Sequence, residues 1–297
     1  MKIIFLVLAL KLLEIAKFKY HSTIQFAIYC TLAFMKKIVC LILFFTIGTV
    51  FCQGHKTTIT KLNSFPIEAD VYIGFDGLGN NYFIKNDVFT KQNEHQIFEY
   101  KNISLGKISF VDIINPLKIM LFYENFNSVV TLDNQLNEIQ KINFSEIDNS
   151  MVISKIGMAL KNQFWIYNAI NQKISLFDYL KNNYQTIGNP IPENIKYSQS
   201  NFNNFYWIDE VNNWYSCDIF GKVLLLASIP PFDKIQIFDN EKLLFSIDDK
   251  MYFLDNKTKA LIKIEIFEKS FQNFHYKDQI LAIFTNQQIT NYKIKLP

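Results

Sequence analysis

A strongly apolar segment that ends in a polar turn recurs six times along the chain, and this repeat limits the possible folds more than any other feature. The segments end at positions 86, 124, 168, 209, 248 and 285, which are 37 to 44 residues apart. In chain order they read NYFIKN, IMLFYE, QFWIYN, FYWID, LLFSID and ILAIFT. A period of about 40 residues indicates an array of similar units that stack on one another.

A second marker, an apolar residue (here Leu, Phe or Cys) followed by Asp, keeps nearly the same period. These aspartates are Asp133, Asp178, Asp218 and Asp255, with spacings of 45, 40 and 37 residues. Turn-like Asn, Lys or Gly follows each of them within four residues, and another apolar run comes next. Because an Asp side chain hydrogen-bonds the backbone of a tight turn, the marker indicates a hairpin at the same place in successive units.

The remaining pattern is that of short strands. Runs of four to eight residues, rich in Ile, Val, Phe and Tyr, alternate with polar clusters. After residue 52 no stretch sustains a capped helical period. Four strands in a unit of about 40 residues are typical of a propeller blade. A parallel β-helix has a shorter repeat, and an immunoglobulin-like array has units of about 100 residues. We therefore predict an all-β fold, a β-propeller of six four-stranded blades.

The two ends of the array predict how the ring closes. The last unit shows three strands, near residues 271–276, 280–284 and 289–294, before the chain ends. A β-branched run at 57–62 stands alone before the first unit. We expect this N-terminal strand to complete the last blade, because the pairing removes two open sheet edges.

Residues 35–52 have the composition of a signal peptide. Met35, Lys36 and Lys37 form a short positive region, and an apolar run of about 13 residues follows, which is too short to span a bilayer. We expect cleavage after Cys52, with acylation of Cys52 as the alternative. For residues 1–34 two interpretations stay open: translation begins at Met35 and these residues are an apolar extension outside the fold, or they form part of an N-terminal membrane anchor. The predicted organisation is thus 1–34, a leader at 35–52 and one propeller domain at 53–297, exported to the periplasm or cell surface of a Gram-negative bacterium.

Charge and cysteine content narrow the function of the exported part. The first 52 residues hold six lysines and one acid, which leaves 24 lysines against 26 acids and no arginine. A slightly acidic surface without Arg is a poor match to phosphates or base edges, so a nucleic-acid partner is not expected. Cys217 is the one cysteine after Cys52, which excludes an internal disulfide. No stable membrane span is predicted in this part.

One segment carries a family resemblance. The sequence Asp76-Gly77-Leu78-Gly79-Asn80-Asn81-Tyr82 resembles the D-x-x-G-N-x-Y pattern of NHL-type six-bladed propellers, although only the first unit matches well. Leader style and composition are also similar to those of uncharacterised secreted propellers of flavobacterial genomes. The NHL resemblance implies that this turn joins the two inner strands of a blade. It also implies a binding role in most members, with lactonases and lyases among the relatives, but no catalytic residue of those enzymes matches a position here.

Motifs for catalysis and metal binding are sparse. His55, His95 and His275 lie far apart in the sequence, and we expect them at solvent-exposed or edge-strand positions. No G-x-S-x-G, H-E-x-x-H or P-loop pattern occurs. Residues 76–81 offer oxygens that calcium could use, but they lack the alternating acids and distal Glu of a calcium loop. We expect a tight turn there.

The first candidate site is a ring of polar turns. If the recurring apolar segment is the second strand of each blade, its turns emerge on one face around the central channel. They carry Asp87, Glu124, Asn168, Asp209, Glu210, Asp248, Asp249 and Asn286. Such a ring is suited to a cation or a polar ligand; ordinary hairpin chemistry is the alternative.

The second candidate site is the aromatic concentration in the fourth unit. It consists of Phe202, Phe205, Tyr206, Trp207, Trp214 and Tyr215. Strand alternation buries half of these between blades, and the rest would form an exposed patch for a glycan or a protein. Packing of the whole group in the core is the alternative.

Two functions follow from these observations. The first is an exported, non-catalytic binding or scaffold propeller that needs no cofactor, with Glu124, Asn168, Asp209, Asp248, Trp207 and Trp214 as candidate ligand-binding residues. The second is a metal-dependent lactone or ester hydrolase with a divalent cation in an acidic channel. Fold alone does not decide between them.

Overall fold

A computed structural model describes residues 35–36 and 59–297 of the chain. The chain divides into two units, residues 1–56 and 57–297, and the second contains the whole of the folded array. The predicted extension at 1–34 and, apart from Met35 and Lys36, the predicted leader at 35–52 lie outside the described residues. Among the described residues, no helix has the length and apolar character needed to cross a bilayer.

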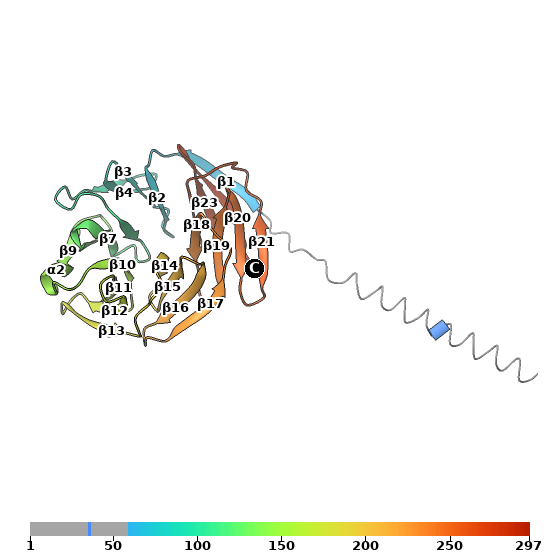
Figure 1. The fold of residues 1–297 in the computed structure, drawn as a ribbon. Coiled ribbons are helices and arrows are strands. Elements are labelled where there is room, and N and C mark those ends of the chain that lie inside the picture. Colours follow the sequence, from blue (N-terminus) through green and yellow to red (C-terminus); the bar gives the residue numbers. More distant parts are fainter. Residues whose placement is uncertain (1–34, 37–58) are drawn as a thin grey trace, which may run out of the picture. The chain divides into compact units, whose positions relative to one another are not determined.

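The array consists of six antiparallel sheets of four strands, which confirms the predicted six-bladed propeller (Figure 1). Blade 1 contains β2 (Val71–Phe75), β3 (Asn81–Lys85), β4 (Val88–Gln92) and β5 (Ile97–Tyr100). Blade 2 contains β6 (Phe110–Asp112), β7 (Ile119–Tyr123), β8 (Ser128–Leu132) and β9 (Glu138–Asn143). Blade 3 contains β10 (Ile153–Met158), β11 (Gln163–Asn168), β12 (Lys173–Asp178) and β13 (Asn183–Ile187).

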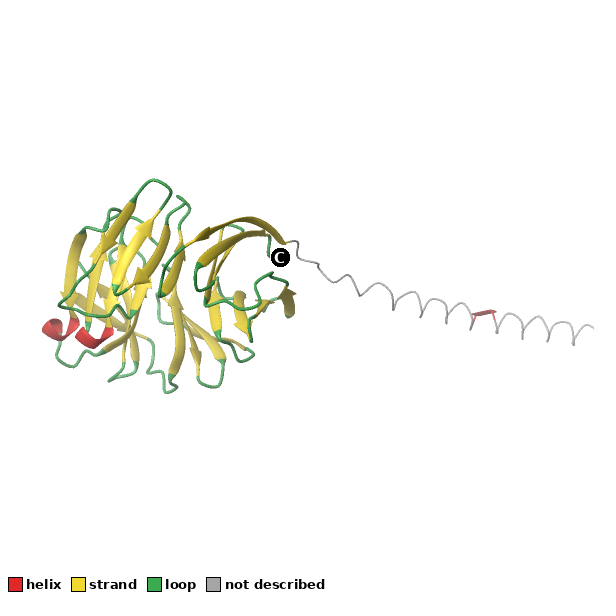
Figure 2. Ribbon diagram, turned by 90° about the horizontal axis from the view of Figure 1, so that it is seen from above, coloured by secondary structure: helices red, strands yellow, loops and turns green. Residues whose placement is uncertain are grey.

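The second half of the ring repeats the arrangement. Blade 4 contains β14 (Ile195–Ser200), β15 (Asn204–Asp209), β16 (Asn213–Asp218) and β17 (Val223–Ser228). Blade 5 contains β18 (Lys234–Ile237), β19 (Lys242–Ile247), β20 (Lys250–Asp255) and β21 (Ala260–Ile264). Blade 6 contains β22 (Asn273–Lys277), β23 (Ile280–Phe284), β24 (Gln288–Ile294) and β1 (Ile59–Pro66). Two short helices, η1 (Glu124–Phe126) and α2 (Phe144–Ile147), occur in blade 2 and are red in Figure 2, where the rest of residues 59–297 is drawn as strands and loops.

The recurring apolar segments are the second strands of the blades, as predicted. β7 and β11, for example, are buried along almost their whole length, whereas the outer strand β13 is exposed along most of its length. A second strand has a neighbouring blade against each of its faces, so its side chains must be apolar at successive positions rather than at alternate ones. The core accordingly falls into six apolar clusters, one at each seam between adjacent blades.

Pairing of the two ends closes the ring, which confirms the sequence-based prediction. β1 pairs antiparallel with β24, from Ile59 opposite Ile294 to Pro66 opposite Gln288. In Figure 1 the pale blue β1 accordingly lies with the red strands of the last blade. The described strand extends four residues beyond the expected run at 57–62, to Pro66.

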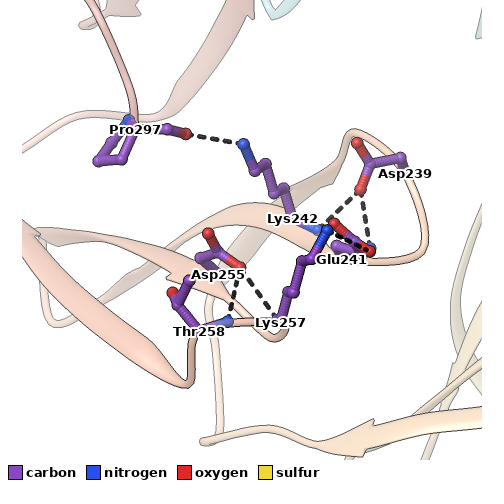
Figure 3. A network of polar contacts seen from close by, with 7 residues as sticks. All are labelled: Asp239, Glu241, Lys242, Asp255, Lys257, Thr258 and Pro297. Atoms are coloured by element: carbon purple, nitrogen blue, oxygen red, sulfur yellow. Dashed lines mark hydrogen bonds and ion pairs between the residues drawn. The ribbon is translucent and has the colours of Figure 1, made fainter.

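The C-terminal residue is held by the neighbouring blade. The Lys242 Nζ donates a hydrogen bond to the carbonyl oxygen of Pro297 at 2.8 Å (Figure 3). Lys242 stands at the end of a turn that Asp239 caps, since the Asp239 carboxylate accepts the backbone N–H groups of Glu241 and Lys242 at 2.7 and 2.9 Å. Blade 5 therefore fixes the position of the chain end that follows β24.

The antiparallel order gives the ring two distinct faces. The turns between second and third strands lie on the same face as the loops that connect successive blades, and we call this the connection face. Hydrogen bonds join the two kinds of loop, as where the Ala169 N–H donates to the Val152 carbonyl at 2.8 Å and the Ile229 N–H to the Asn212 carbonyl at 2.9 Å. The turns between first and second strands lie on the opposite face.

Candidate functional site

The predicted ring of polar turns lies on the connection face, but its members differ in exposure. Glu124 and Asp248, which follow β7 and β19, are exposed. Asn168 and Asp209, which end β11 and β15, are buried. The four side chains therefore do not form one uniform polar surface.

The two buried members bond to the backbone of their own turns, and Asn168 also bonds to the loop that precedes β10. One Asp209 carboxylate oxygen accepts the N–H groups of Val211 and Asn213 at 3.0 and 2.8 Å, and the other accepts the Asn213 amide at 3.0 Å. The Asn168 side chain accepts the Ile170 N–H at 3.0 Å and donates to the Ser150 carbonyl at 3.2 Å. These bonds are the turn chemistry that the sequence left open as the alternative.

Within residues 35–36 and 59–297, no three or more His, Cys, Asp or Glu side chains are grouped closely enough to hold a metal ion. Residues 76–81, the other oxygen-rich segment, form a turn. The Asp76 carboxylate in it accepts four hydrogen bonds: from the N–H groups of Leu78 and Asn80 at 2.8 and 3.0 Å, from the Asn80 amide at 2.8 Å and from the Tyr82 hydroxyl at 2.7 Å. The Asp76 oxygens are thus engaged within the turn, in agreement with the predicted tight turn.

The aromatic residues of blade 4 belong to the core, so the hypothesis of an exposed aromatic patch at Trp207 and Trp214 is wrong. Their exposed fractions are 2% and 0%. Trp207 stacks on Tyr215 with ring centres 5.1 Å apart, in the seam between blades 3 and 4, and Trp214 fills the seam between blades 4 and 5. The physical reason is that second and third strands are covered on both faces. A protein or glycan partner stays a prediction, and it is no longer supported by an exposed aromatic patch.

The sequence did not specify which residues line the central channel. The channel contains a cavity of about 700 Å³, lined by residues of the first strands of blades 1, 2, 4, 5 and 6, of their adjoining loops, and by Tyr206 on β15. Most of the lining residues are apolar, and eight of them are Phe or Tyr: Tyr72, Phe75, Phe110, Tyr197, Tyr206, Phe238, Phe274 and Tyr276. Its size is within the usual range for sites that bind small molecules, about 300–1,000 Å³.

Two glutamines on the channel wall connect neighbouring blades. The Gln199 side chain on β14 accepts the Ile237 N–H at 2.9 Å and donates to the Ile237 carbonyl at 2.6 Å. The Gln236 side chain on β18 does the same to Tyr276, with both distances 2.8 Å. Each amide thus continues the sheet hydrogen bonding from one first strand to the next, where no strand pairing exists.

An aspartate and an asparagine play similar parts elsewhere in the ring. The Asp112 carboxylate accepts the Ile114 N–H on its own blade and the Met158 N–H on blade 3, both at 2.9 Å. Burial raises the pKa of Asp112, although these two backbone donors act in the opposite direction. The Asn273 amide on β22 donates to the Tyr72 carbonyl on β2 at 2.7 Å. These polar groups therefore belong to the scaffold.

His275 differs from them. It lies on β22, an edge strand of its sheet as expected, but this edge faces the channel, and the partly buried side chain is among the residues that line the cavity. Its ring meets Phe75 edge-on, with centres 5.1 Å apart. Within the described part of the chain, the imidazole has no hydrogen-bond partner. Burial, and then the charge of Lys277, lower the pKa of His275 to about 4.

A pH dependence of stability follows from this environment. In the unfolded chain a histidine has a pKa of about 6.5, so between about pH 6.5 and about pH 4 the unfolded chain binds a proton that the folded one does not. The contribution of His275 to the free energy of unfolding therefore falls as the pH falls through this window, by at most about 3 kcal/mol. We expect the free energy of unfolding, measured with urea, to fall more between about pH 6.5 and about pH 4 in the wild type than in His275→Phe.

Lys277 and Asp112 remain in both proteins, so the difference between the two profiles isolates the imidazole. Asp112 acts against the trend, because a raised carboxyl pKa favours the folded state as the pH falls. Parallel profiles for the wild type and His275→Phe would contradict the lowered pKa of His275 in the folded chain.

The thiol of Cys217 is shielded from solvent. Cys217 on β16 is buried in the seam between blades 3 and 4, and burial, followed by the charge of Asp218, raises the pKa of its thiol to about 12. Because the thiolate is the reactive form of cysteine, this thiol is unreactive near neutral pH.

Comparisons with known proteins give fold-level similarity. No protein-family model matches the chain, and no curated protein matches it. A streptogramin B lyase structure is similar with a TM-score of 0.52 at 11% identity, over 80% of this chain and 98% of that chain. Virginiamycin B lyase from Staphylococcus aureus is similar with a TM-score of 0.53 at 12% identity, over 81% of this chain and 100% of that chain.

A third solved structure, a protein of unknown function from Bacteroides thetaiotaomicron, has a TM-score of 0.53 at 10% identity, over 80% of this chain and 72% of that chain. Identities this low show that the chain shares the propeller fold with these proteins. The more specific resemblances, to NHL-type and flavobacterial propellers, stay predictions.

Proposed function

We propose that this chain is an exported, non-catalytic propeller that binds a small molecule in its central channel. The observation that carries the proposal is the character of the cavity of about 700 Å³, whose lining is mostly apolar. Four polar side chains of the lining already form hydrogen bonds to the backbone of a neighbouring blade: Gln199, Gln236, Asp112 and Asn273. An apolar cavity with few available polar groups is the usual form of a ligand site. Export rests on the leader predicted at 35–52.

Two properties of the channel favour binding over the hydrolase alternative. The Asp112 carboxylate is engaged with two backbone N–H groups, which leaves it poorly placed to act as a base. Among the described residues, His275 has no hydroxyl, thiol or carboxylate in hydrogen-bond contact that it could activate or that could orient it. A general base and its nucleophile normally form such a contact.

The proposal is tested by methyl NMR on protein labelled at the isoleucine δ1 carbons. Ile73, Ile113, Ile114, Ile235 and Ile237 line the cavity. Ile97, Ile103, Ile139 and Ile170 are exposed on other parts of the molecule and serve as the internal control. Indole, 2-naphthol and cyclohexanol, added singly, should shift the first set and leave the second unchanged.

Shifts spread over the exposed isoleucines, or none in the channel set, would contradict the proposal. The same samples are then incubated with 4-nitrophenyl acetate and a γ-lactone. Turnover that Asp112→Asn abolishes would instead support the hydrolase.

A further inference from the structure

We propose that His275 is the polar anchor of the channel site, and that the ligand is an uncharged, flat, mostly apolar ring compound with one hydroxyl or carbonyl group. This inference rests on the proposed function and adds the chemistry of the ligand to it. It follows from the shape of the chain around His275, the charge state of the imidazole and the residues that share the cavity with it.

The strand opposite His275 is shaped around the imidazole. A Cβ atom at Gly74 on β2 would lie 2.7 Å from two atoms of the His275 ring, closer than real Cβ contacts allow. Gly74 has φ +152°, a backbone conformation that favours glycine, and the register of β2 shifts between Tyr72 and Gly74. A glycine and a β-bulge thus make room for the His275 ring beside β2. Both features are typical of strands that a neighbouring group approaches closely.

The imidazole is neutral at the pH of most biological settings, because burial lowers its pKa to about 4. A neutral imidazole has one N–H donor and one acceptor nitrogen. These atoms match a hydroxyl, which donates to the acceptor nitrogen, or a carbonyl, which accepts from the N–H. They do not match an ion, since burying an unpaired charge in an apolar cavity is costly.

The charged neighbours support an uncharged ligand. Asp112 and Asp278 both line the same cavity, so an anionic ligand would meet like charges there. Lys277, on the same strand as His275, also lines it and disfavours a cation. A neutral ligand avoids both penalties.

The apolar residues indicate a flat ring. Phe75 already meets His275 edge-on, and Phe238 and Tyr276 form an aromatic pair with ring centres 5.2 Å apart. Phe110 and Tyr197 are among the other aromatic residues of the lining. Aromatic side chains bind flat rings by stacking and edge contacts.

The experiment compares two probes of nearly the same shape. The dissociation constants of 2-naphthol, which has a hydroxyl group, and of 2-methylnaphthalene, which has a methyl group in its place, are measured for the wild type and for His275→Phe. The variant keeps a ring at position 275 but removes both nitrogen atoms. We expect about tenfold weaker binding of 2-naphthol to the variant, the usual value of one hydrogen bond, and less than about twofold change for 2-methylnaphthalene.

The outcomes separate this inference from the proposed function. If both probes bind the wild type but His275→Phe changes neither or both equally, the channel is a binding site and the role of His275 is wrong. If neither probe binds the wild type, both proposals fail. Should His275→Phe not fold, equal affinity of the wild type for the two probes would overturn the inference, and tighter binding of 2-naphthol would support it.

Discussion

A chain that begins at Asp70, and therefore lacks β1, should lose its cooperative thermal transition. β1 contributes the outer strand of blade 6 and pairs with β24 from Ile59 to Pro66. Without it, β24 becomes an open edge and the buried residues Ile289 and Tyr292 lose a covering strand. The seam between blades 6 and 1 also loses Phe65 and Ile67.

The measurement is thermal unfolding followed by circular dichroism, with size-exclusion chromatography to detect association. A chain that begins at Gln53 is the matched control, since it keeps β1 and removes the predicted leader. We expect the control to melt as a single transition and the shorter chain to aggregate or to show no transition. Closure by β1 would be contradicted if the two chains melted at the same temperature.

Asp76→Ala should be the most destabilising single substitution in a turn. The buried Asp76 carboxylate holds four hydrogen bonds from Leu78, Asn80 and Tyr82. Burial acts to raise the pKa of Asp76, but these bonds outweigh it and hold that pKa below its ordinary value. Alanine would leave the Asn80 amide and the buried Tyr82 hydroxyl without this acceptor. We expect the free energy of unfolding to fall by about 2–4 kcal/mol.

Asp133→Ala is the control for this prediction. Asp133 accepts the same three kinds of bond, from the N–H groups of Gln135 and Asn137 and from the Asn137 amide, at 2.8, 2.8 and 2.9 Å. These bonds lie at the surface, where water replaces them when they are lost. Urea unfolding should therefore show a clearly smaller loss for Asp133→Ala. Equal losses in the two variants would mean that burial does not set the cost of removing this turn.

The recurrence of the turn that Asp76 forms could have been predicted from the sequence. Asp76 with Asn80, Asp133 with Asn137 and Asp209 with Asn213 are each four residues apart and make the same bonds. The Gly-Asn pair of the NHL pattern occurs in blade 1 alone. The Asp-x-x-x-Asn spacing was the broader signal, because the bonds need only the carboxylate, two backbone N–H groups and an amide.

The number of blades and the closure of the ring could be predicted because both depend on a periodic pattern. Each second strand is covered on two faces and therefore leaves a continuous apolar run at a fixed interval. The closure could be predicted because both of its parts depart from the period: the last unit lacks one strand, and the run at 57–62 is one strand without a unit. A continuous apolar run of four or five residues is a local property, and the sequence displays it directly.

The channel could not be predicted in this way. Gln199 and Gln236 look like ordinary polar positions in short strands, and their role depends on how close the next blade lies. The fit of His275 against Gly74 joins residues about 200 positions apart in the sequence. The aromatic group around Trp207 was ambiguous for a related reason: composition marks an aromatic residue, but only packing decides whether a blade covers it.

The most direct test of channel binding is a crystal structure of the protein soaked with 2-naphthol. The proposal predicts density for the ring in the cavity beside Phe75, with the hydroxyl oxygen within about 3 Å of a His275 ring nitrogen. Density on the connection face near Glu124 and Asp248, with none in the channel, would contradict it and would favour the ring of polar turns as the site.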